Sequence, residues 1–259
     1  MTRLAITGLD VRFGDRQVVD IDELSLGAAE IVGLAGESGS GKSMTTLAVL
    51  GLAHTVGATV RGSITLDGTE LTALSQRDLR EVRGRRIAAI FQSPSMAFSP
   101  VFRVGRVMHS ALRLHGMSKS DAAQAASRAM RQVLLSPSLL DRYSLQLSGG
   151  QLQRVAIAIA LALRAEVLLA DEPTSALDVT VQAEVLELLR ELREQEGMSV
   201  LFISHDLAVV AELCDRVAIM QGGRIVEQGP AGVVLSAPKD PYTADLLASV
   251  PTISTEPGQ

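Results

Sequence analysis

The sequence predicts an α/β fold in which a mainly parallel sheet carries a phosphate-binding loop. Residues 36–43 read GESGSGKS, between an apolar run and a helical pattern. Several later apolar runs end in acidic or polar residues, and an alanine-rich helical segment interrupts their alternation with helices. Alternating strand and helix patterns are typical of α/β folds, and the interruption predicts a helical insert.

The loop at residues 36–43 fits the pattern G-x-x-x-x-G-K-[ST] at every fixed position. An expected buried strand (29–35) precedes it, and an expected helix (44–50) follows. This context matters because such a loop binds phosphates with unpaired amides and a helix N-terminus. Lys42 is expected to reach the β- and γ-phosphates and Ser43 to ligate Mg²⁺. A glycine-rich turn with a solvated lysine is the alternative.

Composition limits the classes of protein. The chain has 259 residues, 47% of them hydrophobic, which is enough for a substantial core. The net charge of −5 argues against nucleic-acid binding through bulk charge. The single cysteine, Cys214, excludes an intramolecular disulfide and a cysteine-based cluster. Residues 1–10 lack a secretory apolar core, and the longest apolar run (155–163) is shorter than the about 20 residues of a spanning helix. Any membrane attachment is therefore expected to be indirect.

The other elements follow from apolar periodicity and turn residues. Strands are expected over 4–13, 18–22, 62–66, 87–91, 167–170, 199–203, 217–220 and 224–227. Helices are expected over 79–86, within 104–135, and over 155–163, 181–197 and 207–213. In the helical insert, the residues expected on one face are Ala122, Ala125, Ala129 and Val133. Residues 252–259 are expected to form a loose tail.

The expected strand at 167–170 is followed by two adjacent carboxylates, Asp171 and Glu172. In a parallel α/β sheet the ligand lies at the carboxyl ends of the strands, where Asp171 would meet the Mg²⁺ held by Ser43. Glu172 would then polarise a water for attack on the γ-phosphate. Taken alone, a solvated acidic pair at a strand end is an equally good interpretation.

Residues 147–151 read LSGGQ, the signature of the ABC ATPase family, and the chain resembles that family along nearly its whole length. The resemblance implies a P-loop, RecA-like nucleotide-binding domain with an antiparallel β subdomain and a helical insert. It further implies that two such domains face head to tail, with each ATP between the loop of one and the signature of the other. A Ser-Gly-Gly turn at a helix N-terminus suits an anion.

The resemblance also implies how one domain, residues 1–259, is divided. Its expected parts are a catalytic core with the antiparallel β subdomain (1–92 and 165–235), a helical subdomain carrying the signature (93–164) and a C-terminal tail (236–259).

The resemblance assigns further residues one by one. Gln92 matches the glutamine that contacts Mg²⁺ and the attacking water and senses the membrane partner. Residues 175–178 match a loop that crosses the dimer interface, and His205 matches the histidine that contacts the γ-phosphate. Phe13 is a candidate for stacking on adenine, with ordinary core packing as an equal alternative.

The predicted site therefore has four sets of residues. The expected catalytic residues are Glu172, His205, Gln92 and Lys42. The residues expected to bind ATP in the same chain are Phe13, Gly36, Glu37, Ser38, Gly39, Ser40, Gly41, Lys42, Ser43, Met44 and Gln92. Those expected to act on the partner chain's ATP are Ser148, Gly149, Gly150, Gln151 and Asp178. Those expected at Mg²⁺ are Ser43, Gln92 and, through water, Asp171.

Finer features resemble the ATPase subunits of oligopeptide, dipeptide and nickel importers. The matching stretches are 36–52, 91–94, 98–101, 170–182 and 240–247, the last with Asp240 where that branch has histidine. The cysteine-rich segment of many peptide-importer ATPases has no counterpart, so no iron–sulfur cluster is expected, and the length resembles nickel- or metallophore-type subunits.

The branch resemblance implies an ATP-hydrolysing subunit that powers import of a peptide, nickel or metallophore through dimer closure. Its expected partners are two transmembrane permease subunits, a paralogous ATPase (a heterodimer) or a second copy, and indirectly an extracytoplasmic solute-binding protein, without nucleic acid. The expected location is peripheral, at the cytoplasmic face of the inner membrane, with residues 93–106 lining a groove for the permease.

Two alternatives belong to other functional classes. One is the ATPase of a phosphonate-type or exporter ABC assembly. The other is a soluble ABC ATPase in DNA repair or translation. The acidic charge and the absence of zinc-type cysteine pairs and of a tandem second ATPase domain count against the soluble ATPase. The solute stays open, because this subunit does not contact the cargo.

Overall fold

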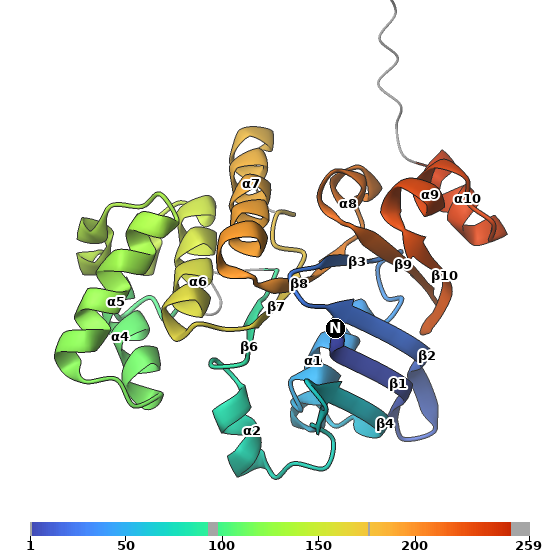
Figure 1. The fold of residues 1–259 in the computed structure, drawn as a ribbon, viewed down its shortest axis with the longest axis horizontal. Coiled ribbons are helices and arrows are strands. Elements are labelled where there is room, and N and C mark those ends of the chain that lie inside the picture. Colours follow the sequence, from blue (N-terminus) through green and yellow to red (C-terminus); the bar gives the residue numbers. More distant parts are fainter. Residues whose placement is uncertain (1, 93–97, 176, 250–259) are drawn as a thin grey trace, which may run out of the picture.

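The computed structural model describes residues 2–92, 98–175 and 177–249. The start of the expected permease groove, Ala176 of the expected interface loop and the tail from 252 lie outside these ranges. The described residues form two sheets with helices packed against them (Figure 1). This arrangement confirms the predicted α/β fold with an antiparallel part and a helical insert.

The core sheet carries the phosphate-binding loop. Its strand order is β10 (Arg224–Pro230), β9 (Arg216–Gln221), β3 (Ile31–Ala35), β8 (Ser199–Ser204), β7 (Val167–Asp171) and β6 (Ile87–Ile90). All neighbours are parallel except β10 and β9, which form the predicted hairpin. Strands β3, β7 and β8 are buried along their whole length, as expected for a parallel sheet covered on both faces. Their carboxyl ends share one edge of the sheet.

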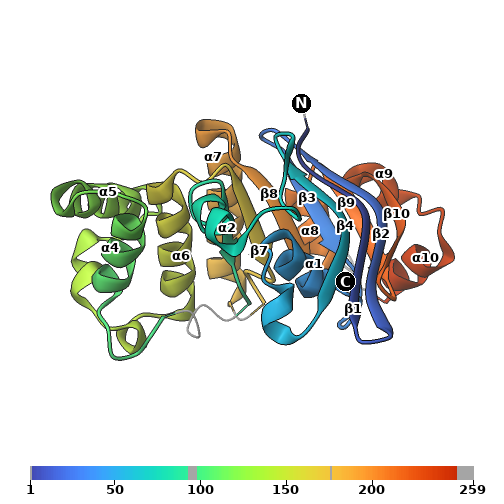
Figure 2. The same ribbon diagram turned by 90° about the horizontal axis from the view of Figure 1, so that it is seen from below.

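The second sheet is antiparallel and covers helix α1 (Lys42–Val49). Its order is β2 (Arg16–Gly27), β1 (Thr2–Phe13), β4 (Thr59–Leu66) and β5 (Thr69–Glu70). One apolar core joins the inner face of this sheet to Ala48 and Val49 of α1 and to Val32 and Leu34 of β3. Seen from below, α1 accordingly lies between the two sheets (Figure 2). The helix that follows the phosphate loop is thus fixed on both sides.

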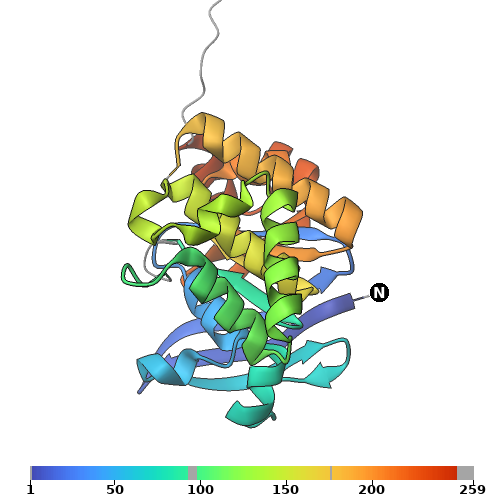
Figure 3. The same ribbon diagram turned by 90° about the vertical axis from the view of Figure 1, so that its left-hand side faces the viewer.

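The insert forms a separate helical layer, which faces the viewer in green and yellow in Figure 3. Its helices are α4 (Val104–Leu114), α5 (Lys119–Gln132) and α6 (Gly149–Leu163), joined by the 3₁₀ turns η2 (Pro137–Asp141) and η3 (Ser144–Gln146). The buried residues of α5 are Ala122, Ala126, Ala129 and Met130, and the partly buried Ala125 packs against the same core, as does Val133 just after the helix. The predicted face of Ala122, Ala125, Ala129 and Val133 is therefore confirmed, and Ala126 and Met130 widen it to the i, i+4, i+7, i+8 stripe of a core-facing helix.

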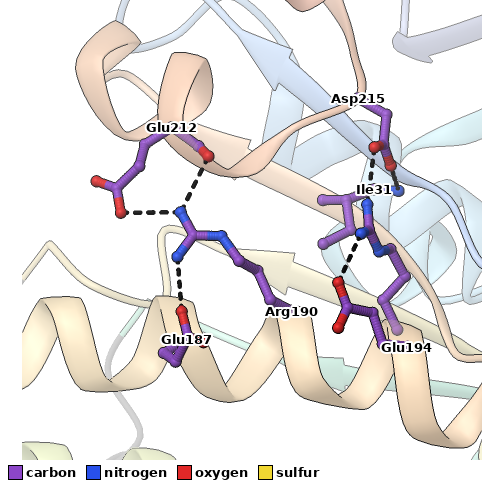
Figure 4. A network of polar contacts seen from close by, with 7 residues as sticks. Ile31, Glu187, Arg190, Glu194, Glu212 and Asp215 are labelled. Atoms are coloured by element: carbon purple, nitrogen blue, oxygen red, sulfur yellow. Dashed lines mark hydrogen bonds and ion pairs between the residues drawn. The ribbon is translucent and has the colours of Figure 1, made fainter.

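Helix α7 (Val179–Glu196) is tied to α8 (Leu207–Leu213) and to the start of β3 by two arginines (Figure 4). Arg190 donates to the Glu212 carboxylate at 2.9 Å and to its carbonyl at 3.0 Å. Arg193 donates to Asp215 at 2.8 Å, and the other oxygen of Asp215 accepts the Ile31 amide at 2.8 Å. Asp215 thereby connects α7 to the strand that leads into the phosphate loop.

Several helices differ from the expectations, and the largest shift in a predicted helix is at α6, which begins at Gly149 and not at 155 because Ser148 caps it there. Helix α2 (Gln76–Val82) begins three residues before the predicted start, since the hydroxyl of Ser75 accepts the Asp78 amide and caps it. Two helices lie where the sequence analysis predicted none, α9 (Ala231–Ser236) and α10 (Pro241–Ala248). A further 3₁₀ turn, η1 (Ala53–Val56), follows α1. The segment treated as a tail thus includes a regular helix that packs against the core.

Candidate nucleotide site

A cleft of about 700 Å³ lies at the carboxyl edge of the core sheet. Its walls include every residue predicted to bind ATP in the same chain except Ser40, a loop residue that is buried. Glu172 and His205 also line it, so the ends of β3, β7 and β8 converge on one space. Two further lining residues, Val18 and Leu246, were not predicted from the sequence.

The phosphate loop is pressed against strand β9. Gly36 has φ +151°, and a Cβ there would lie 2.1 Å from the carbonyl oxygen of Met220, so a side chain does not fit. Lys42 Nζ donates to the carbonyl oxygens of Gly36 at 2.8 Å and Glu37 at 2.7 Å. Burial lowers the pKa of Lys42, and the negative charges of Glu172, Asp171 and Glu37 oppose this shift. The ammonium group is therefore buried but surrounded by acceptors.

Asp171 ends strand β7, is 5% exposed and is not among the residues that line the cleft. Burial raises the pKa of Asp171, the nearby Glu172 charge raises it further, and the Ser43 hydroxyl and the Lys42 charge lower it. A hydroxyl beside a buried carboxylate is a suitable donor set for Mg²⁺, which prefers oxygen ligands and keeps several waters. The residues present therefore fit a Mg²⁺ ion bound together with phosphates.

Glu172 is held by side chains from both neighbouring strand ends. Gln92 Nε2 donates to Glu172 Oε2 at 2.8 Å, and His205 Nδ1 lies 2.9 Å from Glu172 Oε1. The backbone of Glu172 has φ +47°, in the left-handed region, and its amide donates to the carbonyl of Ile203 at 2.9 Å. Such a conformation is unfavourable for glutamate and persists where the surroundings fix it. Three of the four predicted catalytic side chains therefore form one polar chain.

Phe13 is 37% exposed and lines the cleft at the end of β1. Val18 and Leu246 add apolar surface to the same cleft. Adenine stacking by Phe13 stays a prediction. The position of Leu246 had a weak signal in the sequence, because Asp240-Pro241 is a typical helix start.

The signature residues lie apart from this cleft, at the start of α6. Ser148 caps the helix by accepting the Gln151 amide at 3.2 Å, and Gln151 accepts the Ser148 amide at 3.0 Å. A Cβ at Gly150 would lie 2.2 Å from Val181 Cγ1, so the signature helix contacts α7 closely. Asp178 caps α7 by accepting the Val181 amide at 3.0 Å. The described part of one chain does not bring these residues to its own phosphate loop.

A second cleft of about 690 Å³ lies between α5 and the C-terminal ends of α6 and α7. Its walls carry arginines and carboxylates, including Arg3, Arg128 and Glu166, but no residue of the phosphate loop. Glu166 already pairs with Arg3 at 3.1 Å and with Arg86 at 3.0 Å. The cleft at the phosphate loop is therefore the candidate nucleotide site.

Comparison with known proteins agrees with this geometry. The family model described as ABC transporter matches residues 19–175. The chain is 41% identical to the dipeptide transport ATP-binding protein DppD of Escherichia coli (strain K12), over 99% of this chain and 80% of that protein. It is 44% identical to the glutathione import ATP-binding protein GsiA of Salmonella typhimurium, over 98% of this chain but 43% of GsiA.

Two solved structures have the same fold. CbiO1 of Clostridium perfringens, part of the ABC transporter complex cbiONQ, has a TM-score of 0.79 at 25% identity, covering 91% of each chain. A dimeric ATP-binding cassette in a post-hydrolysis state, bound to ADP and Pi, has a TM-score of 0.75 at 26% identity, covering 88% of this chain and 98% of the other.

The fold, the phosphate loop and these matches define a nucleotide-binding subunit of the ATP-hydrolysing kind. The chain belongs to the ABC transporter family. It is an ABC ATPase whose nucleotide is ATP. None of the helices in the described ranges combines the length and apolar character that crossing a membrane requires.

Proposed function

We propose that this chain is the ATP-hydrolysing subunit of an ABC importer for peptides. The observation that carries the proposal is the 41% identity to a dipeptide transport ATP-binding protein over 99% of the chain. A glutathione import ATP-binding protein, whose name also specifies a peptide, matches at 44% identity. Nickel or a metallophore is a second solute class, favoured only by the branch resemblance of the sequence.

ATP is held in the 700 Å³ cleft with its phosphates at the loop and its base beside Phe13. Lys42 and the loop amides stabilise the negative charge of the β- and γ-phosphates. When bound, Mg²⁺ neutralises phosphate charge, and Ser43, Gln92 and, through water, Asp171 would hold it. These assignments are supported by the way the side chains line one cleft.

Glu172 is the general base that takes a proton from the attacking water. Its carboxylate faces the cleft from the end of β7 and accepts a hydrogen bond from Gln92. His205 lies 2.9 Å from the carboxylate and orients it. The contact of His205 with the γ-phosphate is assigned from the family resemblance alone. Positioning and charge stabilisation account for most of phosphoryl transfer, so a fixed carboxylate suits this role.

The signature acts on the nucleotide of a partner domain. Ser148 and Gly149 are exposed at the N-terminus of α6, where a helix dipole and free amides attract an anion. The partner is a paralogous ATPase or a second copy, and closure of the two domains on ATP is the power stroke. Within each chain, such closure would move two parts relative to each other. They are the catalytic core (1–92 and 165–235) and the helical subdomain (93–164).

The closed pair drives a permease of two transmembrane subunits from the cytoplasmic face of the inner membrane. An extracytoplasmic solute-binding protein delivers the solute to that permease. Residues 93–106 are the proposed contact, of which 93–97 lie outside the described residues. Gln92 lies two residues after the end of β6, directly before this segment, and hydrogen-bonds Glu172, which supports its role as the relay.

Transport in proteoliposomes tests the proposal. The chain is co-expressed with the products of neighbouring permease, ATPase and solute-binding-protein genes, and ATP-dependent uptake of a labelled dipeptide is measured, with Glu172→Gln as the inactive control. Dipeptide uptake that the control lacks would support the proposal. Uptake of nickel alone, or co-purification with a translation factor or DNA-repair complex and no permease, would overturn it.

A further inference from the structure

Helix α10 contacts the nucleotide site directly. The hydroxyl of Tyr242 accepts a hydrogen bond from the Glu37 amide of the phosphate loop at 3.2 Å. Leu246, one turn further along the same helix face, lines the nucleotide cleft. We infer that α10 forms a wall of the ATP site, in which Tyr242 positions the phosphate loop and Leu246 contacts the nucleoside. The inference rests on the proposed nucleotide site and adds two residues to it.

The helix is anchored to the sheet that carries the loop. Glu227 on β10 accepts the backbone amides of Lys239 at 2.9 Å and Asp240 at 3.1 Å. Asp240 in turn caps α10 by accepting the Tyr242 amide at 2.8 Å, and Thr243 is fully buried. Because β10 pairs with β9 and β9 with β3, the anchor and the strand that leads into the phosphate loop belong to one hydrogen-bonded sheet.

The hydrogen bond to Tyr242 comes from the peptide group that also holds the loop lysine. The peptide group between Gly36 and Glu37 donates its N–H to the Tyr242 hydroxyl, and its carbonyl accepts Lys42 Nζ at 2.8 Å. Since a peptide group is planar and stiff, fixing its N–H also fixes the direction of its carbonyl. Tyr242 is thus one peptide group away from the ammonium that meets the phosphates.

Leu246 serves the other end of the nucleotide. It is partly buried, and its remaining surface faces the cleft that Phe13 and Val18 also line. Contact with an apolar side chain favours the binding of a base or of ribose carbons, but does not favour the binding of a hydrated triphosphate. Leu247, the next residue, packs against the same core but does not line the cleft, so it is a matched control.

Competition binding to the purified full chain tests both roles, with a fluorescent ATP analogue displaced by MgATP or by magnesium tripolyphosphate. Tyr242→Phe should lower the affinity for both MgATP and magnesium tripolyphosphate by about three- to tenfold, the effect of one lost hydrogen bond. Leu246→Ala should lower the affinity for MgATP by about three- to tenfold and leave the affinity for magnesium tripolyphosphate unchanged. Leu247→Ala should change neither affinity.

The possible failures are distinguishable. The proposed site itself is contradicted if the wild-type chain does not bind MgATP, or if its affinity for MgATP is no higher than that of Lys42→Ala. Normal MgATP binding by the wild type together with unchanged binding by Tyr242→Phe and Leu246→Ala overturns only the role of α10. An equal loss in Leu246→Ala and Leu247→Ala would also overturn it, because the helix would then act only through overall stability.

Discussion

His205 Nδ1 lies 2.9 Å from Glu172 Oε1, and this contact joins the ends of the neighbouring parallel strands β7 and β8. Gln92, from the end of β6, donates to the other oxygen of the same carboxylate. Three strand ends are therefore coupled through one side chain. Gln92 lies directly before residues 93–106, the segment proposed to contact the permease.

Replacing Glu172 with glutamine tests its role as the general base. Glu172→Gln keeps the shape and both hydrogen-bond positions but cannot take a proton at neutral pH, so the rate should fall by about 10²–10⁴-fold. ATP binding should persist, and the variant should form a stable ATP-bound dimer with its partner, measured by size-exclusion chromatography. Glu194→Gln on α7, which removes a carboxylate outside the cleft, is the control and should leave the rate unchanged. Near-normal turnover by Glu172→Gln would remove the base assignment.

A double-mutant cycle tests whether His205 acts through Glu172. His205→Ala alone should lower kcat by about ten- to a hundredfold, because it removes a charge or hydrogen-bond partner from the base. In the Glu172→Gln background the same change should add little, since groups that act as a unit are not additive. Steady-state ATPase rates of the four proteins measure the coupling. Additive losses would show that His205 works independently of Glu172.

The contact between the signature helix and α7 predicts a stability difference between two adjacent glycines. Gly150→Ala places a methyl 2.2 Å from Val181 Cγ1 and should cost about 1–3 kcal/mol through overpacking. Gly149→Ala meets Leu177 only at 3.6 Å and should be neutral or stabilising. Adding Val181→Ala to Gly150→Ala should recover stability. Thermal unfolding measures all three, and equal melting temperatures for the two alanine variants would contradict the packing.

Glu70 predicts a pH dependence of stability. Burial raises its pKa, but hydrogen bonds from Ser63, Thr72 and the Ile64 amide outweigh this and lower the pKa to about 2, from an ordinary 4.5. Because the folded pKa is depressed, the stabilisation is present above about pH 4.5 and is lost as the pH falls toward 2.

The measurement is chemical denaturation of Glu70→Ala across this range. The variant should be less stable than the wild type by about 2 kcal/mol at pH 7, the scale of hydrogen bonds to a charged group. The difference should shrink between pH 4.5 and pH 2. The exposed Glu81 provides a control in Glu81→Ala, which should show no such trend. A difference that is constant with pH would mean that the Glu70 charge is not responsible.

Most of the core could be predicted from the sequence because its signals are local. Fewer than about twenty residues of sequence are enough to recognise a fully apolar strand such as β3 or β8, or a glycine-rich loop before a helix. The strand ends with Asp171, Glu172 and His205 were predicted from the same runs, and the structure brings them to one edge of one sheet. Their catalytic roles stay predictions.

The contribution of α10 could not be predicted, because it depends on contacts over a long sequence distance. Tyr242 reaches the phosphate loop across 205 positions of the chain. Its helix is short, with eight residues, and its apolar pattern is too brief to distinguish from a loop. The left-handed backbone of Glu172 was also invisible, since it is imposed by the surrounding strands and not by the residue type.

The central claim is that one chain supplies the phosphate loop of its own site and the signature of its partner's. Titration of MgATP into two single-chain variants by calorimetry tests it most directly. Lys42→Ala should lose most of its ATP affinity. Ser148→Asp keeps a good helix cap and adds a charge that repels phosphate, so it should bind ATP as a single chain like the wild type, but no longer form the ATP-bound dimer. Equal loss of single-chain binding in both variants would contradict the claim.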